Sequence, residues 1–394
     1  SIGGFTFVVF KTYKMNDMKG KQGMVCMGLL LVLSSCHTGK QITASGLQRK
    51  DFQTEVNGQH TDLFTLSNKQ GMEVCITNYG ARVVSILVPD RNGKREDVVC
   101  GFSTITEYME QRQNFGSTVG RYIGRILNAR FTLDGVEYKL VPNNGKSGHI
   151  SHGGNPGFAD RMWKVEQADT HRVRLSYLSP DGENGFPGNL KVTLVYSLGE
   201  DDNALDLTYE ATTDAPTVLN LSHHSFFNIS GNFTKSVEDQ QLWVDADRFT
   251  PYDDKKCVTG EYLPVAGTPL DFRMPHAIGE CIDADHPQLK VVNGYDHTWE
   301  LNTKGDDTRP AAWVYDPASG RKMEIFTTEP GMQIYTGNGL KGKMTGKRGI
   351  AYPFRSAVCF ETMHFQDSPN QPGFPSTVLR PGEVFRSHTV YKFE

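Results

Sequence analysis

Cysteine is sparse in this chain and never stands in a spacing that would bind a metal. Only seven of the 394 residues are cysteine. Five of them fall in the body of the chain, at Cys75, Cys100, Cys257, Cys281 and Cys359. Five thiols cannot all pair, and neither C-x-x-C nor His-x-His spacing occurs, so the pattern indicates neither a zinc site nor a redox dithiol. We expect buried free thiols instead.

A strong excess of one charge is also lacking, as are the motifs of nucleotide and metal enzymes. The formal net charge is −4, which gives no electrostatic reason to bind nucleic acid. Residues 337–343 have the glycine spacing of a phosphate-binding loop, but Met344 stands where Ser or Thr would hold magnesium, and no helical pattern follows. No Gly-x-Ser-x-Gly, His-Glu-x-x-His or calcium-loop pattern is present. These absences favour a neutral or polar small-molecule ligand.

Long hydrophobic runs are missing as well, which bears on the start of the chain. The apolar run over 24–33 is about 10 residues long, whereas a membrane-spanning helix needs ~20. It follows Lys19 and Lys21 and ends in Leu-Ser-Ser-Cys at 33–36. Positive, then apolar, then small residues are the order of a signal peptide. We therefore expect a signal peptide rather than a transmembrane anchor.

The end of this run resembles the lipobox of bacterial lipoproteins. In this interpretation Cys36 carries the lipid, residues 1–36 are the leader, and residues 1–14 precede the native start. Residues 37–50 then form a flexible tether. The protein would be exported, either periplasmic or held at a bacterial membrane only through the lipid at Cys36. An ordinary secretory signal with a coincidental cysteine is the alternative.

Helical periodicity is rare, and strand-like alternation takes its place. Only residues 104–112 have the pattern of a helix. Apolar and polar residues alternate over 192–198 and 205–210, as in half-buried strands. Asp134-Gly135 joins two short alternating runs, and this dipeptide favours the positive φ angles of a tight hairpin turn. We predict an all-β fold, a large and mostly antiparallel β-sandwich, with residues 51–394 as one domain because no linker interrupts them.

Two segments far apart in the chain carry candidate acid–base residues. His224 stands in Ser-His-His-Ser-Phe-Phe-Asn at 222–228, and Glu361 stands in Cys-Phe-Glu-Thr-Met-His-Phe at 359–365. We expect both at strand ends among aromatic side chains. A histidine and a carboxylate in partly apolar surroundings suit proton transfer on two sides of a substrate. Because neighbouring side chains alternate in an extended segment, His223 should point away from His224.

Further polar segments stand along the chain in a set order. They are residues 120–126 with Arg125, 151–154 with His152, 294–297 with Asp296, and 333–338 with Gln333. Together with the two acid–base segments, they resemble the aldose 1-epimerase (galactose mutarotase) family. The resemblance extends from about residue 63 to residue 393, and it implies the galactose mutarotase-like supersandwich fold.

The resemblance also implies a chemistry. Glu361 would be the general base and His224 the general acid, and the sugar would be held by Arg125, His152, Asp296 and Gln333. The enzyme would interconvert the α and β anomers of free aldohexoses, such as galactose and glucose, by opening and reclosing the ring. This reaction requires no metal, nucleotide or other cofactor. The expected partner is the small-molecule sugar, and a monomer is favoured over an oligomer.

Some positions compete with the implied site or depart from it. The loop over 145–151 is slightly longer than the family spacing, which brings His149 into competition with His152, although only His152 is followed by Gly-Gly. Gly124 stands where many relatives carry Asn, which leaves the substrate preference open. Phe226 and Phe227 are expected in the core rather than at the ligand.

Two other functions remain as alternatives. The same fold could belong to a non-catalytic, glycan-binding surface lipoprotein, although a binder has no need of both Glu361 and His224. The protein could also be an enzyme of the same fold that acts on another sugar, either an epimerase of phosphorylated hexoses or a polysaccharide-processing enzyme. A phosphosugar enzyme should carry extra arginines around its pocket and should lack an export leader.

Overall fold

The computed structural model describes residues 41–394. The predicted leader, its Cys36 and residues 37–40 of the predicted tether lie outside this part. Residues 41–50, which we also assigned to the tether, instead pack against the body of the protein. Leu47 is buried, Arg49 forms an ion pair with Asp62, and the 3₁₀ helix η1 (Arg49–Phe52) follows with Phe52 buried. The apolar side chains of Leu47 and Phe52 explain this packing, because they gain by leaving water.

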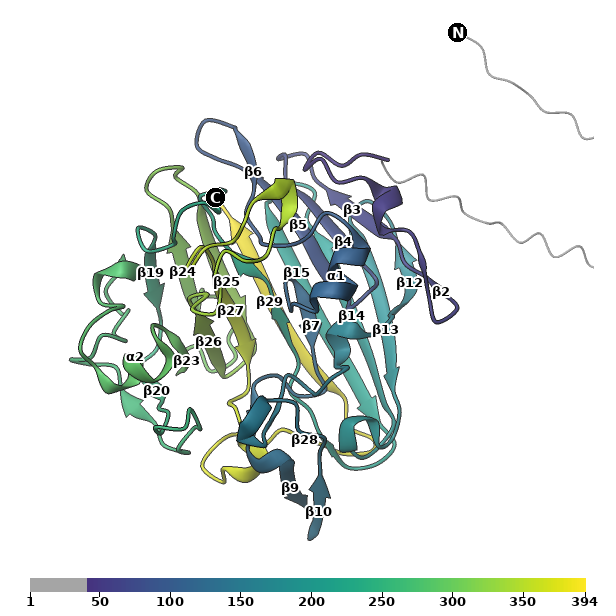
Figure 1. The fold of residues 1–394 in the computed structure, drawn as a ribbon, viewed down its shortest axis with the longest axis vertical. Helices are drawn as coiled ribbons and strands as arrows, with labels where there is room; N and C mark the ends of the chain where they lie inside the picture. Colours follow the sequence, from purple (N-terminus) through teal and green to yellow (C-terminus); the bar gives the residue numbers. More distant parts are fainter. Residues whose placement is uncertain (1–40) are drawn as a thin grey trace, which may run out of the picture. The chain divides into compact units, whose positions relative to one another are not determined.

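The largest sheet has nine antiparallel strands and forms one layer of the fold. In spatial order its strands are β12 (Lys164–Ala168), β13 (Arg172–Ser179), β14 (Leu190–Leu198), β15 (Ala204–Thr213), β29 (Phe385–Phe393), β25 (Lys322–Thr327), β24 (Ala312–Tyr315), β19 (Gln241–Val244) and β22 (His276–Ala277). The C-terminal strand β29 therefore lies in the middle of the sheet, between β15 and β25 (Figure 1).

Two smaller antiparallel sheets form the second layer. The six-stranded sheet has the order β18 (Phe226–Phe227), β27 (Val358–Met363), β26 (Gly331–Tyr335), β23 (Asp296–Glu300), β20 (Arg248–Thr250) and β21 (Leu263–Pro264). The four-stranded sheet has the order β3 (Leu63–Ser67), β4 (Glu73–Thr77), β5 (Arg82–Pro89) and β6 (Arg95–Asp97). Backbone hydrogen bonds such as Asn228 N–H to the Val98 carbonyl, at 2.9 Å, connect the two sheets.

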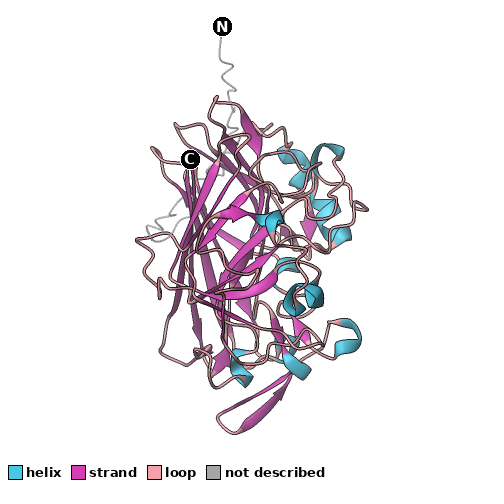
Figure 2. Ribbon diagram, turned by 90° about the vertical axis from the view of Figure 1, so that its left-hand side faces the viewer, coloured by secondary structure: helices cyan, strands magenta, loops and turns pink. Residues whose placement is uncertain are grey.

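The layers meet in one apolar core. This core includes Leu194 and Leu207 from the nine-stranded sheet and Ile76 and Ile334 from the second layer. A hydrogen bond also crosses between the layers, because Oη of Tyr391 on β29 donates to the Phe360 carbonyl on β27 at 3.0 Å. The predicted β-sandwich is thus confirmed, with its short helices gathered along one side of the strands (Figure 2).

Several local predictions are confirmed in detail. The predicted helix is α1 (Ile105–Gln111), and it begins with a capping box in which Thr104 Oγ1 accepts from Glu107 N–H. Asp134-Gly135 forms a two-residue turn with φ angles of +51° and +79°, between β9 (Arg130–Leu133) and β10 (Val136–Lys139). The alternating runs over 192–198 and 205–210 lie in β14 and β15, with their apolar residues buried.

The remaining elements are short. Paired strands are β1 (Glu55–Val56) with β2 (Gln59–His60), β8 (Arg125–Ile126) with β11 (Ile150–Ser151), β7 (Ser117–Val119) with β17 (Ser222–His224), and β16 (Thr217–Val218) with β28 (Val378–Leu379). The second α-helix is α2 (Pro287–Val292), and the other 3₁₀ helices are η2 (Leu127–Ala129), η3 (Gly145–Ser147), η4 (Phe158–Asp160), η5 (Glu183–Gly185), η6 (Ile278–Glu280), η7 (Lys347–Gly349) and η8 (Ser368–Asn370). None of the helices in residues 41–394 has the length and apolarity to span a membrane.

Candidate active site

A pocket of about 270 Å³ brings together residues from distant parts of the chain. All six predicted site residues line it. The full lining consists of Gln113, Asn114, Gly124, Arg125, Ser151, His152, His224, Phe226, Asp296, Gln333, Tyr335, Glu361, Met363 and Gln366. The pocket is slightly smaller than most ligand sites in proteins, which are commonly about 300–1,000 Å³, and its lining is mostly polar.

His224 is the last residue of β17, as predicted, and its ring is packed on several sides. The ring stacks on Phe226 at 5.1 Å between centroids and 24° between planes. The His152 ring meets it edge-on at 5.3 Å. Phe226 packs in an apolar cluster with Cys359 as expected and also lines the pocket, whereas Phe227 packs only in the main core. These contacts hold the His224 imidazole in a defined orientation within the pocket.

Glu361 lies in the middle of β27 and not at a strand end, which corrects the prediction. Its position follows from β27 being an interior strand of the six-stranded sheet, paired with β18 on one side and β26 on the other. On β26, Gln333 is the direct neighbour of Glu361 in the register. Oε1 of Glu361 lies 3.3 Å from Nε2 of His224. The predicted acid and base are therefore adjacent in space.

Burial shifts both members of this pair toward their uncharged forms. Burial lowers the pKa of His224 to about 4. Burial, together with the negative charge of Asp296, raises the pKa of Glu361 well above its usual range, although Arg125 opposes this shift. A protonated His224 is thus a strong acid, and an ionised Glu361 is a strong base. Between their titrations the pair holds one proton in total.

Asp296 begins a hydrogen-bonded network along one wall of the pocket. Its Oδ1 accepts a hydrogen bond of 2.6 Å from Nε2 of Gln333. Nε2 of Gln366 donates to Oη of Tyr252 at 2.6 Å and to Oε1 of Gln333 at 3.3 Å. Burial raises the pKa of Asp296, with Arg125 and the Gln333 hydrogen bond opposing. The network fixes the direction in which these groups can meet sugar hydroxyls.

Arg125 lies on β8 at the edge of the same network. Its guanidinium carbon is 5.9 Å from the centre of the Tyr252 ring, and its Nη1 donates weakly to Oε1 of Gln366 at 3.5 Å. It is the sole lysine or arginine among the residues that line the pocket in the described part of the chain. An arginine with spare N–H groups can orient a neutral hydroxyl or an oxyanion.

His152, rather than its competitor His149, reaches the pocket. His152 follows β11 with φ +51°, and its buried Nδ1 has no hydrogen-bond partner within residues 41–394. Burial lowers the pKa of His152 to about 3, and the neighbouring His224 adds to this effect. His149 does not line the pocket, because its Nδ1 accepts from Asn128 N–H at 2.9 Å and its Nε2 contacts Cys257 Sγ at 3.2 Å. An unpartnered buried nitrogen at a pocket wall is suited to meet a ligand.

Several pocket residues were missed from the sequence. Asn114 and Gln366 line the pocket, but each is a common polar residue in a loop and carries no distinctive pattern. Tyr335 also lines the pocket, and its place in the polar segment over 333–338 had marked it. His223 was predicted to point away from His224, and it hydrogen-bonds Ser225 Oγ at 2.6 Å. Gly124 has φ +75°, and a Cβ added there would lie 2.6 Å from Cγ of Gln366. The missing side chain at Gly124 therefore leaves room for Gln366.

One cluster in the described residues has ligand types that could bind a metal, and it includes the acid–base pair. The ligand atoms of His224, Cys359 and Glu361 lie within 4.8 Å of one another. Burial raises the pKa of the Cys359 thiol well above its usual range, and the charge of Glu361 adds to this. Metal ligation requires a thiolate, so a metal here would have to displace the proton of this buried thiol. All five body cysteines are free, as predicted, but only Cys75, Cys100 and Cys359 are also buried, whereas Cys257 and Cys281 are partly exposed.

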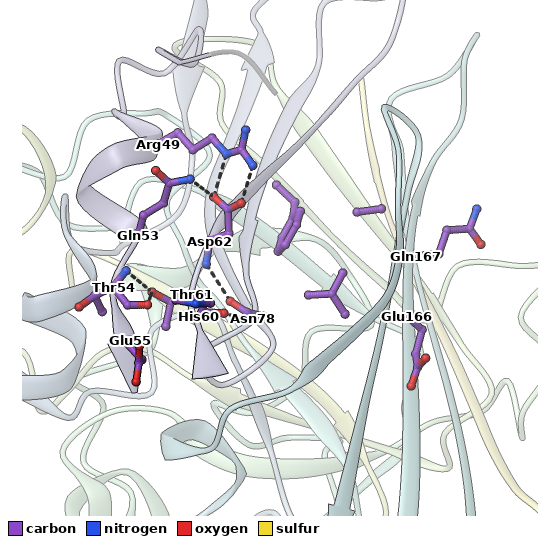
Figure 3. A pocket seen from close by; sticks show the side chains of 13 residues that line it. Arg49, Gln53, Thr54, Glu55, His60, Thr61, Asp62, Asn78, Glu166 and Gln167 are labelled. Carbon is purple, nitrogen blue, oxygen red and sulfur yellow. Dashed lines mark hydrogen bonds and ion pairs between the residues drawn. The ribbon is translucent and has the colours of Figure 1, made fainter. Parts of the chain in front are cut away.

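A larger hollow of about 770 Å³ lies elsewhere, between the N-terminal segment and β12. Figure 3 shows that polar groups on its N-terminal side bind one another, whereas Glu166 and Gln167 of β12 stand apart from them. Asp62 accepts from Nε of Arg49 at 2.8 Å and from Nε2 of Gln53 at 3.1 Å. Asn78 Oδ1 accepts from Asp62 N–H at 2.9 Å. These groups hold the N-terminal segment in place and offer no buried acid–base pair, so the smaller pocket is the candidate active site.

Comparisons with known proteins identify similar chains. A family model described as Aldose 1-epimerase matches residues 62–392. The galactose mutarotase of Sus scrofa is 39% identical over 330 residues, which cover 84% of this chain and 93% of that protein. The aldose 1-epimerase of Escherichia coli K12 is 36% identical and covers 86% of this chain and 96% of its own length. Among solved structures, a GalM/aldose epimerase homologue from C. elegans has a TM-score of 0.78 at 31% identity, covering 85% of this chain and 99% of its own.

Proposed function

The chain belongs to the aldose 1-epimerase family, and we propose that it interconverts the α and β anomers of free aldohexoses such as galactose and glucose. One observation supports this most directly: Nε2 of His224 lies 3.3 Å from Oε1 of Glu361 in a buried, polar pocket. The pocket volume of about 270 Å³ suits a single sugar ring.

Ring opening requires that the C1 hydroxyl of the sugar loses a proton and that the ring oxygen gains one. In our proposal the Glu361 carboxylate takes the proton of the C1 hydroxyl, and a C1 carbonyl forms as the bond between C1 and the ring oxygen breaks. The electron pair of that bond stays on the ring oxygen, which takes the Nε2 proton of the His224 imidazolium. The products are the open-chain aldehyde, protonated Glu361 and neutral His224.

Ring closure is the same step in reverse after a rotation about the C1–C2 bond. The ring oxygen attacks the other face of the carbonyl while Glu361 returns its proton to the former carbonyl oxygen and His224 takes one back. The pair holds one proton before and after each step, so no proton has to enter from water during turnover. Each positioned acid or base typically contributes about 10²–10⁴-fold to the rate.

The other predicted residues would bind the sugar. Asp296, held by Gln333, offers acceptor lone pairs to sugar hydroxyls. Arg125 and the unpartnered Nδ1 of His152 provide a charged donor and a further polar contact. Such short, charge-assisted hydrogen bonds orient hydroxyl groups well. The apolar wall offered by Phe226 would pack against the C–H surface of the ring.

The alternatives receive less support from the pocket. A phosphorylated hexose would need several cationic groups, whereas Arg125 is the single lysine or arginine of the described lining. Burying the ionisable groups of Glu361 and His224 costs folding stability. A protein that only binds glycans would gain nothing in return for this cost. We therefore retain the free aldose as the substrate.

Magnetisation exchange by NMR tests this function at equilibrium. Aldohexoses show separate anomeric proton signals for their α and β forms, and an epimerase increases the rate of exchange between them. We expect the purified protein to increase this exchange for galactose, glucose or both, above the rate in buffer. Exchange at the buffer rate for every free aldose tested, with folded protein, would rule the function out.

For the leader we propose a lipoprotein signal peptide over residues 15–36 with lipid on Cys36. The support lies in the residues themselves: Lys19 and Lys21, the apolar run over 24–33 and the Leu-Ser-Ser-Cys sequence at 33–36. Expression of the full chain in a bacterial host with radiolabelled palmitate tests this. Label in the membrane fraction that disappears in Cys36→Ser would support it, and unlabelled protein in the cytoplasm would overturn it.

A further inference from the structure

Each nitrogen of the His224 ring has its own partner. Nε2 faces Oε1 of Glu361 at 3.3 Å, whereas Nδ1 lies 3.7 Å from Sγ of Cys359. Cys359 and Glu361 stand two residues apart on β27, so their side chains project from the same face of the strand. One strand thus supplies a group to both nitrogens of the same imidazole.

Packing keeps this arrangement in place. Cys359 is fully buried and is the direct register neighbour of Phe226 on β18. The Phe226 ring stacks on the His224 imidazole, and His152 contacts it edge-on. Contacts on the ring face and edge oppose a flip that would exchange the two nitrogens. The sulfur therefore stays at Nδ1.

We propose that Cys359 is a positioning residue for His224, whose sulfur accepts a hydrogen bond from Nδ1–H so that Nδ1 keeps its proton and only Nε2 exchanges protons with the substrate. The inference rests on the proposed function. The hydrogen bond at one ring nitrogen decides which nitrogen of a neutral histidine carries the proton. Protonated Glu361 at Nε2 favours the same tautomer, and the sulfur at Nδ1 adds a second preference for it from the other side of the ring.

The reaction needs that particular tautomer. As an imidazolium, His224 has a proton on both nitrogens, and it gives the Nε2 proton to the ring oxygen. The neutral ring must then keep Nδ1–H, because Nε2 has to present a lone pair that takes a proton back during ring closure. A neutral ring with its proton on Nε2 would have no lone pair facing the pocket, and closure would be slow.

A thiol suits this task better than a carboxylate would. An ionised carboxylate at Nδ1 would stabilise the imidazolium and make it a weaker acid. The buried Cys359 thiol stays neutral, since burial raises its pKa well above the usual range. Neutral sulfur is a weak acceptor, so it orients the Nδ1 proton and adds no negative charge beside His224.

Nitrogen NMR on histidine-labelled protein tests the tautomer directly. At neutral pH we expect the His224 signals of the full enzyme to show Nδ1 protonated and Nε2 unprotonated. In Cys359→Ala we expect part of the population to move to the other tautomer, and kcat to fall about 3- to 10-fold, the worth of one ordinary hydrogen bond. KM should change little, because Cys359 does not line the pocket. Cys359→Ser should restore most of kcat, since its oxygen can accept the same hydrogen bond.

Cys100→Ala is the matched control. Cys100 is a fully buried free thiol in the same apolar cluster as Cys359, but it does not line the pocket. Equal losses of kcat in both alanine variants would overturn the inference, and so would an unchanged tautomer and kcat in Cys359→Ala.

If Cys359→Ala does not fold, the tautomer of the parent protein still tests the proposal, because a proton on Nε2 of neutral His224 there contradicts it. If the parent does not accelerate mutarotation, the proposed function fails, and the tautomer measurement still tests the contact with Cys359.

Discussion

Nε2 of His224 and Oε1 of Glu361 lie 3.3 Å apart, with side-chain exposures of only 6% and 4%. One residue ends β17 and the other stands in the middle of β27, so the pairing of distant strands brings them together. An acid and a base so close can act on two oxygen atoms attached to the same carbon. The anomeric carbon of an aldopyranose bears such a pair, its hydroxyl oxygen and the ring oxygen.

The pH dependence of catalysis should be a broad bell. Activity requires the pair to hold one proton. Below about 4, the pKa of His224, both groups are protonated and the base is lost. Above the raised pKa of Glu361, both groups are unprotonated and no proton remains for the ring oxygen. We expect kcat/KM, corrected for the buffer rate, to be flat between these limits. A profile that changes around 6.5, as for an ordinary histidine, would contradict the account.

Replacing the base should cost activity and not stability. The pKa of Glu361 is higher in the folded protein than in the unfolded chain, so folded-state stability falls as the pH rises from the unfolded pKa through the folded one. Glu361→Gln removes this penalty. We expect its melting temperature at pH 8 to equal or exceed that of the parent by about 1–3 °C, with a smaller difference at pH 4.

Glu329→Gln provides the control for this comparison. Glu329 is another buried carboxylate, but it is paired with Nδ1 of His364 at 2.7 Å. An amide at this position weakens or loses this hydrogen bond, which leaves buried polar groups poorly paired, so this variant should melt below the parent at pH 8. A lower melting temperature for Glu361→Gln as well would show that the Glu361 carboxylate is stabilised in the fold, contrary to our interpretation.

His152→Ala should weaken sugar binding more than it slows the chemistry. Its buried Nδ1 has no partner in the described protein, and a lost polar contact to the ligand of about 1.4 kcal/mol corresponds to tenfold. We expect KM for galactose or glucose to rise about tenfold and kcat to change less. His149→Ala, on the same loop but outside the pocket, should leave KM unchanged. A rise in KM for His149→Ala alone would reverse our assignment of the two histidines.

Gly124→Ala should disturb the pocket through Gln366. The added Cβ would lie 2.6 Å from Cγ of Gln366, which donates to Oη of Tyr252. We expect KM to rise several-fold, about 1 kcal/mol in binding, as measured in steady-state kinetics. Gly135→Ala is the control, because it has the same positive φ with no atom within 4 Å of the added Cβ. Equal kinetics for the two variants would show that Gln366 has room to move.

Local rules predicted much of the fold. The helical pattern over 104–112, the Asp134-Gly135 turn and the alternation along β14 and β15 each depend on neighbours in the sequence, and the structure confirms all three. The order of the strands within the sheets could not be predicted in the same way. For example, β29 pairs with β15 and β25, which lie far from it in the sequence. No local pattern determines such pairings.

The site was predictable only where a residue belongs to a recognisable segment. His224 and Glu361 were found through their segments, but the mid-strand position of Glu361 was missed, although β27 contains one charged residue among buried neighbours. Gln366 and Cys359 gave no signal, since a loop glutamine and a thiol in an apolar strand are ordinary. Their roles depend on contacts that only the folded chain creates.

Polarimetry on freshly dissolved α-D-galactose and α-D-glucose tests the central claim most directly, with the parent protein compared with Glu361→Gln and His224→Asn. We expect the parent to accelerate mutarotation of at least one sugar. Each variant should lose about 10²-fold or more of the enzymatic rate while remaining folded by circular dichroism. A parent that leaves both curves at the buffer rate, or variants that keep the parent's rate, would contradict the assignment of His224 and Glu361 as acid and base.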